Sequence, residues 1–131
     1  IYCMTNLTKL SKIFSTIPEV KLAYFFGSRA TNNFGSISDY DFAVYLFPYN
    51  PVDAIKTKIN LISKLTKYLK TDNVDLLILN NSEKPELNYE VINNGKLLID
   101  IEPNRVIFEP KVLNEYFDYK MSLSRYGLTS V

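Results

Sequence analysis

Residues 22–28, with the sequence LAYFFGS, are followed after ten residues by residues 39–47, with the sequence DYDFAVYLF. Each segment contains an apolar and aromatic run of strand length, and polar residues stand at one end of each run. Gly27 and Ser28 close the first expected strand, whereas Asp39 and Asp41 open the second. Because side chains alternate across a strand, both aspartates are expected on one face. These segments predict a glycine-serine turn and two carboxylates at strand ends.

The rest of the chain alternates between helical and extended patterns. It predicts an α/β (α+β) fold, with a mixed sheet of about four strands flanked by helices. Gly95 is expected to end a helix in the left-handed conformation. The expected elements are helices at 5–17, 29–32, 51–69, 85–93 and 110–126, and strands at 20–26, 40–47, 74–79 and 97–101.

The longest expected helix, 51–69, has a clear start signal. Asn50 is suited to cap the first turn, Pro51 suits the first helical position, and Asp53 is favoured at the positive end of the helix dipole. Apolar residues at three- and four-residue spacing predict a buried stripe that consists of Val52, Ile55, Ile59, Ile62, Leu65 and Leu69.

The succession of strand, long helix and strand predicts a crossover that joins a parallel pair, 40–47 and 74–79. The run at 76–79 is apolar on both faces. For that reason strand 74–79 is expected at the centre of the sheet, covered on both sides.

Composition indicates one soluble globular domain. The chain has 131 residues, 47% hydrophobic and 22% charged, with a net charge of +1. Without a strong basic charge, nucleic acid is not favoured as a partner. A lone cysteine, Cys3, and the lack of an apolar stretch of about 20 residues fit a cytoplasmic protein with no membrane contact.

The chain contains no histidine. Ser-His-Asp and Cys-His catalysis and histidine-ligated zinc sites are therefore excluded within this chain. Carboxylates are left as the obvious metal ligands, and they favour hard cations such as Mg²⁺.

Three aspartates form the candidate metal site. If strand 74–79 lies parallel to strand 40–47 and beside it, Asp75 falls at the same end of the sheet as Asp39 and Asp41. Their mutual repulsion is relieved when they share divalent cations. Asp75 is the weaker member, because Asp72 is nearby and an acid before a buried strand is also common turn chemistry.

The candidate phosphate site follows the first strand. Gly27 permits a sharp turn, and the amide and hydroxyl of Ser28 can donate to phosphate oxygens at the start of a short helix. Arg29 either adds a charge-assisted contact or is an ordinary surface charge. Triphosphate and metal ions would meet between the first two strands.

Three motifs carry a family resemblance: GSRA at 27–30, SDYDFAV at 38–44 and VDLL at 74–77. Together they resemble the nucleotidyltransferase superfamily typified by DNA polymerase beta and kanamycin nucleotidyltransferase. The chain is similar over nearly its whole length to the minimal nucleotidyltransferases. Many of these are antitoxins encoded beside a HEPN-type RNase toxin. The resemblance implies a single minimal nucleotidyltransferase domain over residues 1–131.

The resemblance also implies residue roles. Gly27 and Ser28 match the phosphate-binding pair, and Asp39 and Asp41 match the ligands of two Mg²⁺ ions. Asp75 matches the third carboxylate, which helps to activate the attacking hydroxyl. The implied reaction transfers AMP from ATP to a tyrosine hydroxyl of the partner toxin, which is silenced.

Two other functions remain open on the sequence. The chain could be a catalytically idle binding antitoxin, or a small-molecule nucleotidyltransferase of the antibiotic-modifying kind. The aromatic C-terminal stretch, which includes Tyr116, Phe117, Tyr119 and Tyr126, is expected to pack into the core, with a partner-docking surface as the alternative.

Overall fold

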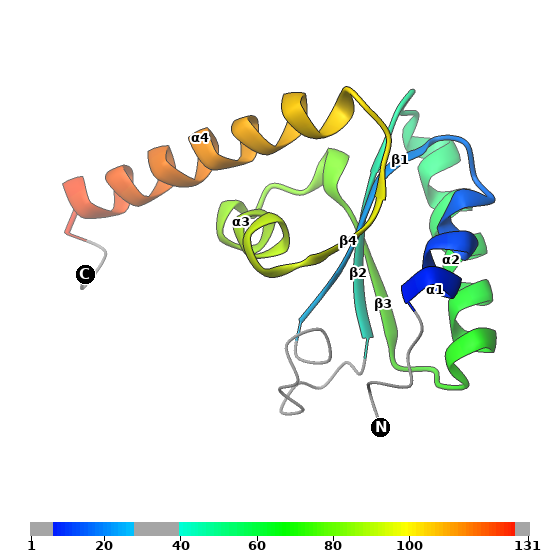
Figure 1. Cartoon of the computed structure of the whole chain (residues 1–131). Helices are drawn as coiled ribbons and strands as arrows, with labels where there is room; N and C mark the ends of the chain where they lie inside the picture. Colours follow the sequence, from blue (N-terminus) through cyan, green and yellow to red (C-terminus); the bar gives the residue numbers. More distant parts are fainter. Residues whose placement is uncertain (1–6, 28–39, 128–131) are drawn as a thin grey trace.

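The computed structural model describes residues 7–27 and 40–127, which form a four-stranded mixed sheet with helices on both faces (Figure 1). The α+β prediction is confirmed, while the short helix expected at 29–32 lies outside the described residues. No helix in the described ranges is long and apolar enough to cross a membrane. In chain order the elements are α1 (Leu7–Ser15), β1 (Val20–Phe26), β2 (Tyr40–Leu46), α2 (Pro51–Leu69), β3 (Val74–Ile78), the 3₁₀ helix η2 (Leu79–Asn81), α3 (Pro85–Asn94), β4 (Lys96–Asp100) and α4 (Asn104–Arg125).

The strand order is β3-β2-β1-β4. β1 is antiparallel to both β2 and β4, whereas β2 and β3 are parallel. The parallel pair agrees with the prediction from the α2 crossover. The predicted central position of β3 is wrong, because β3 is an edge strand. The apolar run in β3 arises because both faces of the strand are packed, with Leu76 against α2 and Leu77 on the other side. Such a run does not indicate whether the strand has hydrogen-bonded neighbours on one side or on both.

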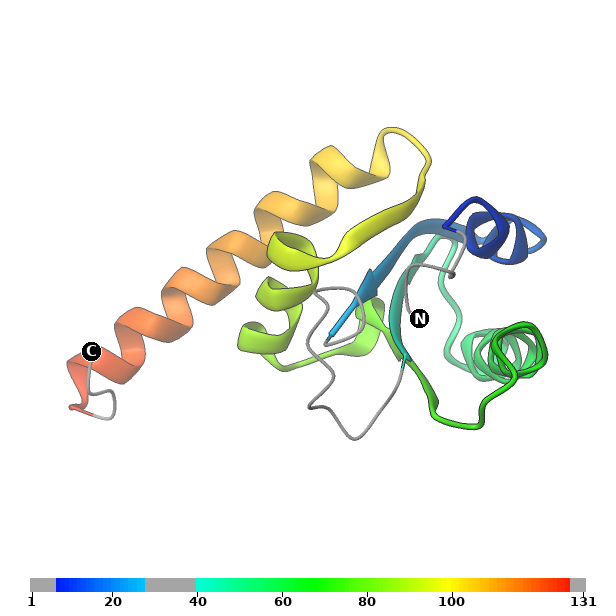
Figure 2. The ribbon, with the colours of Figure 1, turned by 60° about the horizontal axis from the view of Figure 1, so that its bottom comes forward.

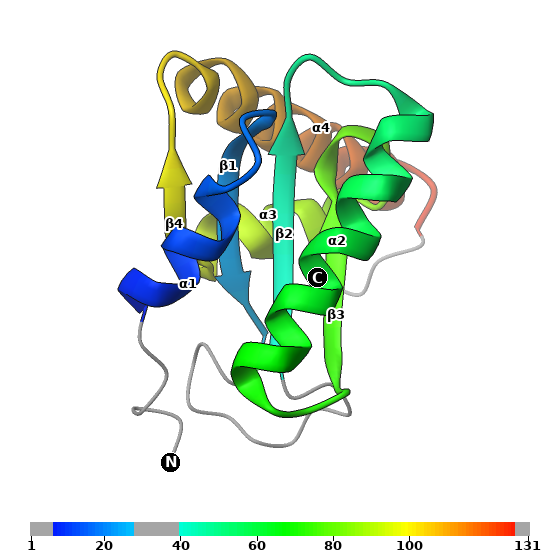
Figure 3. The same ribbon diagram turned by 90° about the vertical axis from the view of Figure 1, so that its right-hand side faces the viewer.

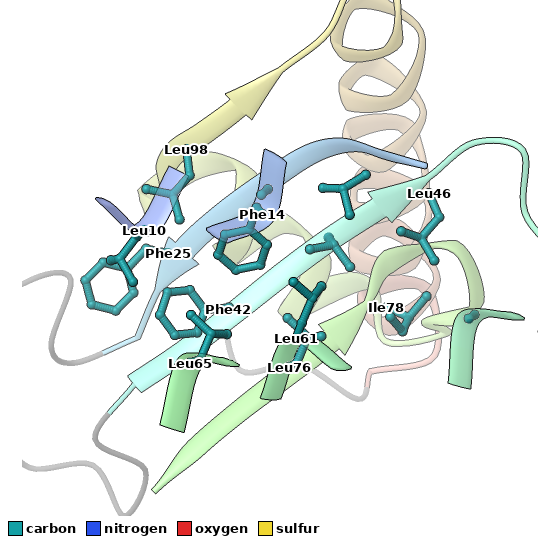
Figure 4. Packing of buried hydrophobic residues seen from close by; sticks show 14 residues of the cluster. Leu10, Phe14, Phe25, Phe42, Leu46, Leu61, Leu65, Leu76, Ile78 and Leu98 are labelled. Atoms are coloured by element: carbon teal, nitrogen blue, oxygen red, sulfur yellow. The ribbon is translucent and has the colours of Figure 1, made fainter. Parts of the chain in front are cut away.

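Alternate strand residues supply two apolar layers. One layer lies under α1 and α2, as Figures 3 and 4 show, and includes Phe25 and Phe42. The Phe42 ring centroid lies 5.1 Å from that of Phe25 and 5.5 Å from that of Phe14. The other layer lies under α3 and α4 and includes Phe26 and Ala43. The sheet is thereby fixed between two helical layers.

The start of α2 is confirmed in detail. The Asn50 side-chain oxygen accepts hydrogen bonds from the backbone N–H groups of Val52 and Asp53, at 2.9 and 3.1 Å. Pro51 occupies the first turn. This cap satisfies donors that the helix itself leaves unpaired.

The predicted buried stripe of α2 is wrong in its first half. Val52, Ile55 and Ile59 are each more than 60% exposed, while the buried residues are Ala54, Leu61 and Leu65. The apolar arc of this helix is wider than one packing face, and the sheet covers only one edge of it. Ile62 and Leu69 of the predicted stripe do pack partly against the core.

Gly95 ends α3, but in an extended conformation with φ −71° and ψ 152°. The predicted left-handed cap is therefore wrong. The need for glycine is steric, since a Cβ at this position would collide with the backbone oxygen of Val91.

α4 begins at Asn104, and Pro110 lies inside it rather than at its start. A proline removes the donor that would bond the carbonyl four residues earlier, at Val106. Val106 is exposed, so water can serve that carbonyl. Core packing of the C-terminal aromatics is also wrong for Phe117 and Tyr126, which are exposed, although Tyr116 stacks on Tyr89 of α3 with ring centroids 4.0 Å apart.

Candidate active site

β2 and β3 bring two of the predicted carboxylates together where both strands begin. Asp41 and Asp75 are partners in the register of the parallel pair. Because strand side chains alternate between faces, both lie on the face that carries Ala43 and Leu77, which α3 and α4 cover further along. The expected juxtaposition of Asp41 and Asp75 is present, whereas Asp39 lies outside the described residues.

Asp41 is the more enclosed of the two, being half-buried where Asp75 is exposed. Loss of hydration raises the pKa of Asp41 above its ordinary value, and the negative charge of Asp75 raises it further. The fold thus holds this carboxylate where its ionised form is disfavoured. A bound cation would reverse that preference.

Gly27 follows the end of β1 with φ +85°, a conformation that side-chain-bearing residues rarely adopt. The residue before it, Phe26, is paired with Asp41. A Cβ on residue 27 would collide with Oδ2 of Asp41. The sequence predicts the sharp turn, but the contact between turn and carboxylate emerges only from the fold.

Asp75 stands at the outer edge of the sheet. Its Oδ1 accepts a hydrogen bond from the backbone N–H of Leu76, at 2.9 Å. This bond fixes the carboxylate beside the strand while the residue remains exposed. Asp75 is therefore the more exposed of the two carboxylates.

Three predicted site residues, Ser28, Arg29 and Asp39, lie outside the described residues. Among residues 7–27 and 40–127, no three His, Cys, Asp or Glu side chains gather into a group that could hold a metal ion. The segment 28–39 leaves β1 at Gly27 and re-enters β2 next to Asp41. Any further ligand on the predicted pattern belongs to that segment.

A cavity of about 320 Å³ lies elsewhere, between the end of β2 and α4. Its lining includes Tyr45, which is four residues along β2 from Asp41 and thus about 13 Å away. Among the described residues that line it, Glu115 is the one acidic residue, and the Asn80 side chain exchanges hydrogen bonds with both backbone groups of Leu46. The described lining of this cavity therefore contains no pair of carboxylates.

The paired carboxylates have the donor chemistry for a hard divalent cation. The left-handed turn at Gly27 lies directly beside the Asp41 carboxylate. Together these features suit chemistry on a metal-bound phosphate compound.

Comparisons with known proteins point the same way. The family described as "Polymerase beta, Nucleotidyltransferase" matches residues 8–104. The protein adenylyltransferase MntA of Aphanizomenon flos-aquae (strain 2012/KM1/D3) is 30% identical over 106 residues, which cover 74% of this chain and 69% of that protein.

Solved structures share the fold. A toxin-antitoxin complex with AMP-PNP contains a chain with a TM-score of 0.74 and 25% identity, covering 93% of this chain and 95% of that one. A second structure, of a tri-AMPylated Shewanella oneidensis HEPN toxin with its MNT antitoxin, gives a TM-score of 0.69 at 24% identity. That match covers 96% of this chain and 95% of the other.

Proposed function

The chain belongs to the polymerase beta nucleotidyltransferase family, and on that premise we propose that it is an antitoxin that transfers AMP from ATP to a partner toxin. The observation that carries the proposal is the in-register pair Asp41 and Asp75 beside the left-handed turn at Gly27. The similar MntA protein is a protein adenylyltransferase. The related complexes that contain AMP-PNP or an AMPylated toxin supply the nucleotide and the class of acceptor.

We assign the metal site to Asp39, Asp41 and Asp75. The described pair fits the role, because both ligands are carboxylates and the ionised form of Asp41 is disfavoured until a cation is present. Mg²⁺, when bound, neutralises charge on the phosphate oxygens and lowers the pKa of the acceptor hydroxyl. Two ions are expected from the family resemblance.

The phosphate site is assigned to Gly27, Ser28 and Arg29. Gly27 allows the turn to lie directly against the Asp41 carboxylate, where a Cβ would collide with Oδ2, so that a phosphate bound at the turn would lie close to the metal ligands. Ser28 would donate from its amide and hydroxyl, and Arg29 would add positive charge.

The acceptor is a tyrosine hydroxyl of the partner toxin. Its oxygen bonds to the α-phosphorus of ATP, the bond from that phosphorus to the bridging oxygen breaks, and pyrophosphate leaves. Asp75 would accept the hydroxyl proton, and its exposure at the sheet edge supports this role. Asp41, more enclosed and next to the turn, serves the triphosphate side.

The test uses the full chain, ATP, Mg²⁺ and the purified product of the neighbouring gene. Intact mass should rise on the toxin by one or more AMP units, tandem mass spectrometry should place them on tyrosine, and chelator should abolish the gain. Asp41→Asn should lose transfer, while Asp53→Asn at the exposed start of α2 should keep it. No mass gain with the wild type would refute the proposal.

The same assay separates the two alternatives. Neutralisation of the toxin by Asp41→Asn without any mass gain would identify a binding antitoxin. Transfer to an aminoglycoside in the absence of toxin would identify a small-molecule nucleotidyltransferase.

A further inference from the structure

α4 carries two separate apolar faces. One face packs inward through Phe108 and Val112, which are buried. The other consists of Val106, Leu113, Phe117 and Met121, spaced by seven, four and four residues, which places them on one side of a helix. These four are 72%, 36%, 54% and 61% exposed, respectively. We call this set the α4 stripe.

The first half of α4 is anchored to the sheet. The Tyr24 hydroxyl donates to Oε2 of Glu109 at 2.7 Å, and Nε of Arg105 donates to the same oxygen at 3.1 Å. Arg105 also lies 3.8 Å from Asp100 of β4. Because Tyr24 is buried, this network fixes the helix direction at its base.

The second half of α4 extends beyond α3 and away from the sheet, as Figures 1 and 2 show. Tyr116 stacks on Tyr89 of α3 with an interplanar angle of 8°, which supports the helix laterally at this point. Beyond it Met121 and Tyr126 are exposed. The result is a rigidly based arm with an uncovered apolar side, a pre-organised form that lowers the entropy cost of binding.

A second exposed apolar set exists on α2, formed by Val52, Ile55 and Ile59. The two sets differ in position. α2 packs on the layer that includes Phe42, whereas α4 packs on the layer that includes Ala43, the side to which Asp41 and Asp75 belong. A protein that brings an acceptor to these carboxylates approaches the sheet face on which α4 packs, and not the face that α2 covers.

Size argues against a second copy of this chain as the occupant. A helix of 22 residues is about 33 Å long. With a contact width of about 10 Å, two such stripes would together bury roughly 660 Å², below the roughly 1,200 Å² of a stable interface. A stable interface must therefore include surface beyond the α4 stripe. A partner that also reaches the carboxylates would bury such additional surface.

We propose that the α4 stripe is the docking surface for the toxin, and that the toxin covers it with an apolar surface of its own. The proposal rests on the proposed function for the identity of the partner. Docking on α4 supplies affinity and orientation, and the chemistry stays at Asp41 and Asp75.

The experiment compares two double variants of the full chain, Phe117→Glu with Met121→Glu on α4, and Ile55→Glu with Ile59→Glu on α2. The α2 pair is the matched control, because its residues are similarly exposed on the opposite face. Circular dichroism checks the fold, and calorimetry measures affinity for the purified product of the neighbouring gene.

The α4 variant should bind that protein about 10-fold or more weakly, as hot-spot removal does. The KM for toxin should rise by a similar factor while kcat at saturating toxin stays within about two-fold. The α2 control should match the wild type in both measurements.

Unchanged affinity of the α4 variant, or an equal loss in the α2 control, would overturn the proposal. Sedimentation of the chain without toxin tests for self-association. If the wild type were a dimer and the α4 double variant a monomer, the occupant of the α4 stripe would be a second copy of this chain, and the proposal would be overturned. Binding is measured with Asp41→Asn as well, so a failure of AMP transfer counts against the proposed function and leaves the docking result readable.

Discussion

Asp41 should destabilise the metal-free protein, and Asp41→Asn should therefore stabilise it. Asp41 and Asp75 are in-register partners on adjacent strands. Neighbouring strands are about 4.8 Å apart, so the two charges lie at about 5 to 6 Å. With an effective dielectric constant of about 40 to 80, they repel by about 0.7 to 1.7 kcal/mol. Because Asp41 is half exposed, we expect a net gain of about 1 kcal/mol for Asp41→Asn.

The sign of the pH dependence follows from the raised pKa of Asp41. Well below its ordinary value of 3.8, the carboxyl is protonated in both folded and unfolded chains, and the penalty is absent. As pH rises through the folded-state pKa, the penalty appears and the wild type loses stability relative to Asp41→Asn. The advantage of the variant should be full at pH 7 and vanish near pH 3.

The assay is urea unfolding in the presence of chelator, with Asp118→Asn as an exposed control that should change stability by less than about 0.5 kcal/mol. In thermal unfolding, Asp41→Asn should raise the midpoint temperature by about 3 to 5 °C. Mg²⁺ should make the wild type more stable than Asp41→Asn. At an Mg²⁺ concentration ten times the Kd, binding would stabilise the wild type by about 1.4 kcal/mol. If Asp41→Asn were equal to or less stable than the wild type in chelator at pH 7, the electrostatic reasoning would be refuted.

Three further substitutions test the framework. Gly27→Ala should lower the free energy of unfolding by about 1 to 2 kcal/mol and weaken Mg²⁺ binding measured by calorimetry, because it adds left-handed strain and a collision with Asp41. Gly127→Ala is the control, because at φ +67° with no neighbour within 4 Å it adds the strain alone. Equal metal affinity in the two variants would contradict a role for the contact between residue 27 and Asp41. Tyr24→Phe should lose about 1 to 2 kcal/mol in urea unfolding at pH 7, because a buried hydroxyl no longer bonds a carboxylate. Since burial and Glu109 raise the pKa of Tyr24, the wild-type advantage should persist to pH 10 and decline above it, and a decline that begins near neutrality would argue against this. Asn50→Ala should lower the midpoint of thermal unfolding through a cost of about 1 kcal/mol, and no change would mean that the α2 cap is dispensable.

The juxtaposition at the candidate site could be foreseen because it depends on local rules. Strand alternation and a parallel crossover suffice to bring Asp75 beside Asp41, and both rules operate on short stretches of sequence. The roles of these residues, and of Ser28, Arg29 and Asp39, stay predictions. The collision that forbids a side chain at Gly27 was not foreseeable, because it joins two segments whose approach depends on the register of β1 and β2.

The helices show most clearly what could not be predicted from the sequence, namely which of their apolar residues are buried. In α2, periodicity located an apolar arc, but the arc exceeds one face, and only docking on the sheet decided that Leu61 would be buried and Ile59 exposed. In α4, composition indicated aromatic area but not that Phe117 would remain uncovered.

The sequence by itself determined the four strands, the approximate positions of α1, α2 and α3, the start of α2 and the strand ends at which Asp41 and Asp75 stand. The tertiary structure alone decided which apolar faces are covered, that β3 is an edge and that α4 begins before Pro110. The physical reason is that capping and turn preferences act between residues close in the chain. Burial depends instead on which residues distant in the sequence pack against a given face.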